Sequence, residues 1–233
     1  MTPASPLDLV LLGVLPYVAL VTFFITTIGR YRNRVTRFAY SSLSSQFLEN
    51  RQHFWGLVPF HYGIIVVLLG HLVALLVPRS ILVWNSHPLR LYILEVAALA
   101  FGALTLVGLV AAIVRRVSVT ALLRVTTRGD WVVLGLLLVQ AVTGVGVAMF
   151  YPWGSSWYAA AAAPYLWSVF SLDPAVGVMA VMPWLVKIHV INAWLLVGVA
   201  PFSRLIHVLV APVPYLWRRP QVVRWYRGPE AIS

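Results

Sequence analysis

The sequence contains no cysteine, which excludes disulfides, cysteine-ligated iron–sulfur clusters and thiolate zinc sites within this chain. It is also poor in charge, with 10% charged residues and only six acidic ones, whereas soluble domains average about 25% charged residues. There is no internal repeat, glycine-rich phosphate loop or low-complexity linker. Hydrophobic residues make up 61% of the sequence, and its mean hydropathy is +0.88. This composition predicts an all-α integral membrane protein with room for about five spans of ~20 residues.

Five apolar segments predict five transmembrane helices within a single membrane domain, residues 1–233. The N-terminus lacks a basic n-region, so we expect the first apolar run to be a retained span and not a cleaved signal peptide. Pro16 is expected to kink this span. The expected spans are about 7–28, 57–77, 89–114, 131–151 and 183–210, followed by a basic tail, 211–233.

The arginines mark one side of the predicted membrane. Five follow the first span, four follow the third and four lie in the tail, against Arg79 and Arg90 near the opposite face. The positive-inside rule therefore predicts an outside N-terminus and a cytoplasmic C-terminus in the cytoplasmic (inner) membrane. Residues 152–180 contain no lysine or arginine, so we expect this aromatic segment outside, partly along the interface. The net charge of +11 thus indicates contact with membrane lipid and not with nucleic acid.

Four of the six histidines lie in two predicted spans that run in opposite directions: His61 and His71 in the second, His189 and His207 in the fifth. Metal-binding groups within lipid are costly and indicate function. Antiparallel geometry pairs His61 with His207 toward the cytoplasm and His71 with His189 toward the outside. Each pair suits a bis-histidine b-type haem, which has no open iron position and transfers electrons only. The alternative is that each histidine only forms hydrogen bonds within the bundle.

The spacing of the two histidine sets differs. His61 and His71 are ten positions apart, about 15 Å along a helix, whereas His189 and His207 are 18 positions apart, about 27 Å. Because Pro201 removes a backbone hydrogen bond, we expect the fifth span to bend there and reduce this difference.

Other polar and small residues leave two interpretations open. Lys187 and Arg204 precede His189 and His207, so they could pair with haem propionates or simply extend to the interface. Small residues in the spans allow close approach either of planar groups or of neighbouring helices; these are Gly63, Gly70 and Gly102. His53 and His87 are expected to be solvated loop residues.

Five short motifs stand out: Ser44-Ser45-Gln46, Phe60-His61-Tyr62-Gly63, Gly70-His71, Thr126-Thr127-Arg128-Gly129-Asp130 and the run from Pro201 to His207. They resemble motifs of the gamma subunit of membrane-bound respiratory nitrate reductase. The similarity covers nearly the whole chain, except the N-terminal residues and the loop after Tyr151, which match poorly. Its most specific part is the run from Pro201 to His207.

The resemblance implies a five-helix cytochrome b with two haem b groups. By position, it implies that His71 and His189 ligate the outer haem and that His61 and His207 ligate the inner haem. Quinol would be oxidised near the outer face, and electrons would pass inward to an iron–sulfur beta subunit. That subunit would feed a molybdenum alpha subunit on the cytoplasmic side, where nitrate is reduced during nitrate respiration.

The resemblance also implies a quinol site near the outer haem, formed around Gly70 and His71 with a lysine after the second span. That lysine is absent here; Arg90 is the nearest basic residue, and His87 is an alternative. Arginine does not readily release a proton, so Arg90 would not act as an acid. Lys187 matches the family's basic residue before the outer-haem histidine.

Two alternative functions remain at this point. The same electron conduit could serve a nitrite oxidoreductase, or a complex acting on a chlorine or selenium oxyanion, because relative potentials set the direction of electron flow. More remotely, the chain could be a haem-free membrane anchor or a transporter. Transporters usually contain paired broken helices or inverted repeats, and the sequence has neither.

Overall fold

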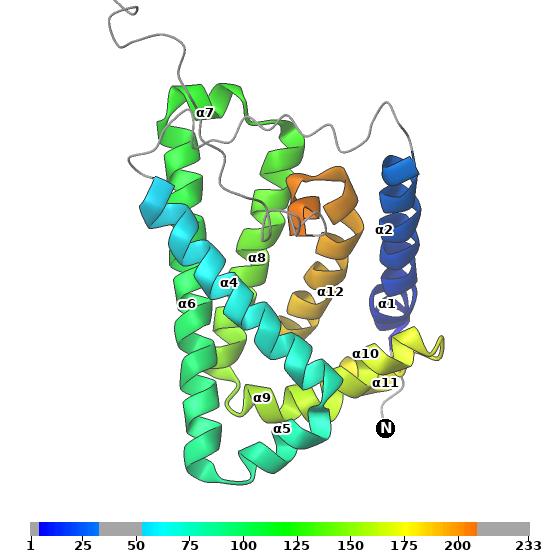
Figure 1. Ribbon diagram of the computed structural model, residues 1–233. Helices are drawn as coiled ribbons and strands as arrows, with labels where there is room; N and C mark the ends of the chain where they lie inside the picture. Colours follow the sequence, from blue (N-terminus) through cyan, green and yellow to red (C-terminus); the bar gives the residue numbers. More distant parts are fainter. Residues whose placement is uncertain (1–4, 33–52, 209–233) are drawn as a thin grey trace, which may run out of the picture.

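The computed structural model describes residues 5–32 and 53–208 of the chain, and these residues form helices without any strand (Figure 1). Five helices in this part are long and apolar enough to cross a membrane, which confirms the predicted all-α membrane fold. The motif Ser44-Ser45-Gln46 and the tail 211–233 lie outside the described residues, as does the side chain of His53. The candidate spans are Pro6–Arg30, Leu57–Leu76, Pro88–Ser118, Arg128–Phe150 and Trp184–Phe202.

The first span is irregular near its start, as expected from Pro16. It consists of α1 (Pro6–Asp8), a π-helical segment (Leu9–Val14) and α2 (Leu15–Arg32). Pro16 has no N–H to donate to the preceding turn, and the wider π-helical turns directly before it accommodate this loss. A capping box between Ser5 and Asp8 starts the helix, with the Asp8 N–H donating to Ser5 Oγ at 3.1 Å.

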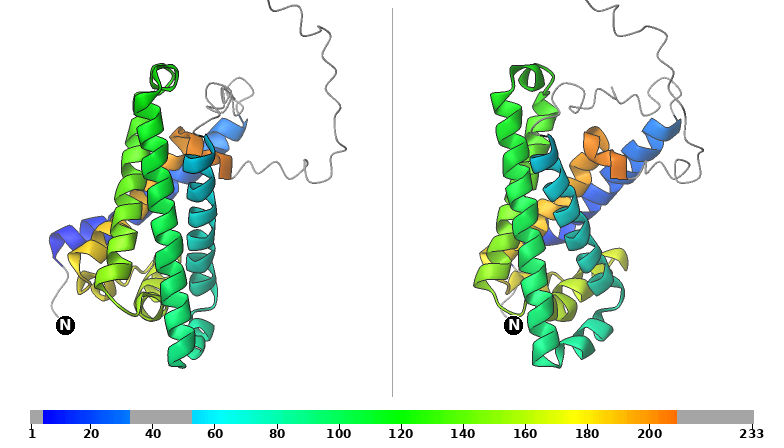
Figure 2. Two further views of the ribbon diagram at one scale, coloured as in Figure 1. Left: turned by 90° about the vertical axis from the view of Figure 1, so that its left-hand side faces the viewer. Right: turned by 60° about the vertical axis from the view of Figure 1, so that its left-hand side comes forward.

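Helices α4 (His53–Leu76) and α6 (Pro88–Ser118) pack closely and are joined by α5 (Pro78–Asn85) (Figures 1 and 2). Their contact centres on Gly63, where an added β-carbon would lie 2.5 Å from the Thr105 hydroxyl oxygen. Gly63 therefore serves helix packing. Prolines occupy the first turns of α5 and α6, where their missing N–H groups cost little.

Helix α7 (Thr120–Arg124) leads into α8 (Arg128–Phe150), which packs against both α6 and α12 (Trp184–Val199). A second capping box starts α8: the Asp130 N–H donates to Thr127 Oγ1, and the Thr127 N–H donates to the Asp130 carboxylate. This cap fixes the Asp130 carboxylate at the N-terminal end of α8.

The aromatic segment after α8 folds across one end of the bundle (Figure 1). The Glu95 carboxylate accepts hydrogen bonds from the Gly154 and Ser155 N–H groups at 3.0 and 2.8 Å, which ties the start of this segment to α6. Tyr165 is fully buried and donates to the Leu12 carbonyl at 2.7 Å. The elements of this aromatic segment are α9 (Gly154–Trp157), a π-helical turn (Tyr158–Ala162), α10 (Ala163–Phe170) and α11 (Val176–Ala180).

The regular part of the last span ends at Val199, earlier than the 183–210 range expected from sequence. Two 3-10 segments follow, Ala200–Phe202 and Arg204–Val208, separated by Ser203 in extended conformation. Pro201 cannot continue the helical hydrogen bonds, and Arg30 donates a hydrogen bond to its carbonyl. The predicted bend at Pro201 is confirmed.

Candidate haem-ligand histidine pairs

The structure brings His71 of α4 and His189 of α12 together. Their imidazole ring centroids are 6.5 Å apart, with an angle of 37° between the ring planes. His71 is exposed and His189 is half-buried. Two residues from different helices therefore face each other across a narrow gap, as antiparallel pairing predicts.

His61 of α4 and His207 of the last 3-10 segment form a second pair. Their ring centroids are 6.3 Å apart, the ring planes make an angle of 65°, and both side chains are exposed. The bend at Pro201 makes this pair possible, because two short 3-10 segments, the second of which contains His207, replace the last turns of a straight α12.

Both separations fit one metal ion held between two imidazoles. A metal–imidazole bond is about 2 Å long, so two axial imidazoles have ring centroids roughly 6 Å apart. Among the described residues, no group of three or more His, Cys, Asp or Glu side chains could hold a metal ion. A pair supplies two ligands, and a porphyrin supplies the equatorial nitrogens that complete a haem iron.

The hydrogen bonds at Nδ1 also fit this role. Nδ1 of three of these histidines lies near a backbone carbonyl of the preceding turn: 2.7 Å from Leu57 O for His61, 2.8 Å from Val67 O for His71 and 2.6 Å from Arg204 O for His207. A carbonyl can only accept, so Nδ1 carries the proton and Nε2 keeps the lone pair that binds metal. Such hydrogen bonds orient ligating histidines.

His189 has different partners, which come from α8. Its Nδ1 lies 3.0 Å from the Thr143 hydroxyl, and an added β-carbon at Gly144 would lie 2.9 Å from its Cε1. The Gln140 amide nitrogen lies 3.0 Å from Nε2 and 3.2 Å from Nδ1. In the ring plane, an atom so nearly equidistant from both nitrogens would overlap Cε1. The amide therefore lies over the ring face and leaves the in-plane lone pair of Nε2 unobstructed.

Sequence reasoning did not identify this polar group on α8. Asn192 extends it, donating to Gln140 Oε1 at 2.7 Å and to the Leu136 carbonyl at 2.9 Å. A signal was present: Gln140 and Thr143 are polar residues three positions apart in an apolar span, and this spacing places them on one helix face. Asn192 has the same spacing from His189.

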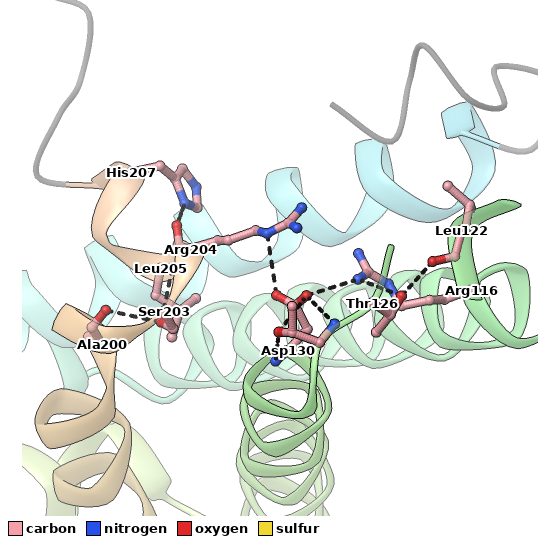
Figure 3. Close-up of polar contacts among 10 residues, drawn as sticks. Arg116, Leu122, Thr126, Asp130, Ala200, Ser203, Arg204, Leu205 and His207 are labelled. Atoms are coloured by element: carbon pink, nitrogen blue, oxygen red, sulfur yellow. Dashed lines mark hydrogen bonds and ion pairs between the residues drawn. The ribbon is translucent and has the colours of Figure 1, made fainter. Parts of the chain in front are cut away.

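The two cations considered as propionate partners both pair with carboxylates. Lys187 Nζ lies 2.9 Å from Asp8 Oδ1, which joins α12 to the start of the first span. Arg204 Nε lies 3.3 Å from Asp130 Oδ1, and Arg116 lies 4.0 Å from the other oxygen of this carboxylate (Figure 3). Asp130 thus connects the His207 segment with α8 and α6.

The candidate quinol-site residues each have different surroundings. Gly70 faces open space, since an added β-carbon there would meet nothing within 4 Å. Arg90 lies over the Trp84 ring, with its guanidinium carbon 5.1 Å from the ring centroid, and His87 is exposed at the start of α6. By contrast, an added β-carbon at Gly102 would lie 3.5 Å from Val145 of α8, so Gly102 serves packing.

Tyr158 contacts the His71 side of the first pair. Its ring centroid lies 5.1 Å from that of His71, and its hydroxyl donates to the His71 carbonyl at 3.3 Å. Burial raises the pKa of the Tyr158 phenol to about 12, so this hydroxyl stays protonated at neutral pH. The phenol therefore supplies a neutral donor beside His71.

The fold and these pairs define a multi-pass membrane protein whose paired histidines suit b-type haem. The chain belongs to the nitrate reductase gamma subunit family, whose sequence pattern matches residues 8–226. This confirms the resemblance inferred from the motifs and makes the chain a member of a family of membrane electron-transfer subunits.

Individual relatives agree with this assignment. The nitrate reductase-like protein NarX of Mycobacterium tuberculosis (strain ATCC 25618 / H37Rv) is 32% identical over 94% of this chain and 34% of its own length. The chain therefore spans about a third of that protein. The nitrate reductase gamma chain of Bacillus subtilis (strain 168) is 27% identical over 92% of this chain and 97% of its own length. The respiratory nitrate reductase 2 gamma chain of Escherichia coli (strain K12) is 28% identical over 90% of this chain and 93% of its own length.

Proposed function

We propose that this chain is a dihaem b-type cytochrome that oxidises quinol and passes electrons to a partner subunit of a nitrate reductase-type complex. The observation that carries this proposal is the presence of two histidine pairs, each with one member on α4. Within the pairs, the ring centroids are 6.3 and 6.5 Å apart. A single pair could be incidental hydrogen-bonding geometry. Two pairs with the same separation, at different depths of one bundle, favour two centres of the same kind.

In this function, the chain would hold and orient the haem groups. Haem b, when bound, supplies one-electron transfer. His71 and His189 would hold the outer haem, and His61 and His207 the inner one. Because two histidines would hold each iron, neither oxygen nor substrate would bind to it. The pairs therefore serve conduction and not substrate chemistry.

We place quinol oxidation beside His71. Oxidation of a quinol to a quinone releases two electrons and two protons, and the protons would leave to the outside. The open space at Gly70 supports this position. Arg90 and His87, at the start of α6, are the candidate polar partners of the quinol; Arg90 supplies charge and hydrogen-bond donors but does not readily release a proton.

The arginines support the proposed membrane orientation, and the relatives support the proposed partners. By the positive-inside rule, the basic loops and tail favour an outside N-terminus and a cytoplasmic C-terminus. An iron–sulfur beta subunit and a molybdenum alpha subunit would dock on the cytoplasmic side. Moving one electron inward against 100 mV, negative inside, costs about 2.3 kcal/mol. The potential difference between quinol and nitrate must exceed this cost if turnover is to conserve energy.

The test uses the whole complex in its membrane. Addition of quinol should produce the reduced b-type absorption spectrum, and subsequent nitrate should reoxidise it. A complex carrying His71→Ala should lose the quinol-dependent reduction while its partner subunits still reduce nitrate with an artificial donor. Failure of quinol to reduce the wild-type complex would remove the proposed function, and reoxidation by another oxyanion but not by nitrate would change the partner's substrate.

A further inference from the structure

We propose that Thr143 is a positioning residue, whose hydroxyl fixes the tautomer of His189 and lowers the reduction potential of the metal centre that His189 holds. The inference rests on the proposed function, because it concerns the outer haem. It goes beyond it by assigning a role to a buried side chain that itself touches neither haem iron nor quinol.

The direction of the hydrogen bond follows from the single hydroxyl proton of Thr143. This hydroxyl lies 2.6 Å from the Val139 carbonyl and 3.2 Å from the Gln140 carbonyl, and carbonyls can only accept. The proton is therefore committed to the backbone of α8, and only the oxygen lone pairs remain for His189. His189 Nδ1, at 3.0 Å, must carry the proton and donate it. Nε2 is then the metal-binding nitrogen.

This arrangement is particular to His189 among the four paired histidines. The other three have Nδ1 on a backbone carbonyl, which no substitution removes. His189 faces α8 so closely that Gly144 has no room for a β-carbon beside Cε1. Gln140, fixed by Asn192, covers one face of the ring. The ring cannot turn away from Thr143 without meeting these neighbours.

The hydroxyl affects the metal through the imidazole. A hydrogen bond that draws on the Nδ1 proton makes the imidazole a more basic ligand, and a more basic ligand favours the more positive, oxidised iron. Thr143 is buried, at 7% exposure, so water does not replace a lost acceptor. Removal of the hydroxyl should therefore raise the potential of the His71–His189 centre and leave the His61–His207 centre unchanged.

The experiment is a spectroscopic redox titration of the purified complex, with the haem content measured alongside. Thr143→Val keeps the shape and removes the acceptor, whereas Thr143→Ser keeps the hydroxyl. Thr143→Ser is the matched control, because it retains both the donor to the Val139 carbonyl and the acceptor for His189 Nδ1.

We expect Thr143→Val to raise one midpoint potential only, and Thr143→Ser to leave both near wild type. Loss of the outer haem in Thr143→Val with retention in Thr143→Ser would equally support the role of the hydroxyl. Unchanged potentials in Thr143→Val, or equal effects of Val and Ser, would overturn the inference while leaving the proposed function intact. A wild-type complex without b-type haem would overturn both.

Discussion

His61 and His207 face each other with ring centroids 6.3 Å apart, although a straight helix would carry His207 about 27 Å beyond His189. The break at Pro201 removes this mismatch. Ser203, in the break, stabilises the new direction: its hydroxyl donates to the Ala200 carbonyl at 3.0 Å and accepts from the Leu205 N–H at 3.1 Å. A proline and a serine thus match the depth of His207 to that of His61.

Loss of one histidine should remove one haem and spare the other. His71→Ala or His189→Ala leaves its partner as a single axial ligand, so the outer haem should be absent. His61→Ala or His207→Ala should remove the inner haem instead. Haem content and low-temperature absorption spectra of each variant measure this outcome.

His87→Ala is the control for these variants, because His87 is exposed and belongs to neither pair. It should retain both haems. If His71→Ala and His61→Ala remove the same spectral component, the pairing along α4 is wrong.

Gly144→Ala should disrupt the His71–His189 centre. The new methyl group would lie 2.9 Å from Cε1 of a ring that Gln140 and Thr143 hold in place, so His189 must leave the position in which it faces His71. We expect near-complete loss of the outer haem, measured by absorption spectroscopy. Gly135→Ala on the same helix, where an added β-carbon meets nothing within 4 Å, should behave as wild type. Equal haem content in the two variants would show that His189 does not require this close contact.

Asp130→Asn should weaken the inner centre selectively. The change removes the ion pair with Arg204, three residues before His207, but keeps an oxygen that can accept the capping hydrogen bond. Arg204 is partly exposed, and such ion pairs contribute about 1 kcal/mol or less, so we expect at most about a fivefold loss of inner-haem retention. Asp173→Asn, an exposed carboxylate, is the control. Detergent-induced haem release followed over time measures the effect, and release of the outer haem first would contradict it.

Lys187 and Asp8 should show a coupled effect on stability. Their ion pair, at 2.9 Å, joins α12 to the start of the first span, and both residues are half-buried. Lys187→Gln or Asp8→Asn alone leaves an unpaired charge, so each should lower the thermal unfolding temperature of the complex. The double variant should lose less than the sum of the two single losses. Strict additivity would mean that the pair does not form in the assembled protein.

The histidine pairing was predictable from sequence because it depends on helix direction and order along the chain. Five apolar segments with alternating arginine-rich connections define antiparallel spans, and depth order then pairs His61 with His207 and His71 with His189. The bend at Pro201 was predictable for the same reason, since proline acts locally.

The surroundings of the histidines were not predictable in this way. Gln140, Thr143 and Gly144 act through the rotation of α8 against α12, and the apolar pattern of a lipid-facing helix does not specify that rotation. The sequence also did not indicate that Lys187 and Arg204 pair with carboxylates of this chain. Asp8 and Asp130 are distant in sequence and reach the cations only through helix packing.

The central claim is that the two pairs, His61–His207 and His71–His189, each hold one haem b. The most direct test is a pyridine haemochrome determination on the purified complex, related to the amount of this chain. The account predicts two haem b groups per chain, falling to one when either pair is broken. Absence of haem b from the wild-type complex, or an unchanged ratio after substitution of a paired histidine, would contradict it.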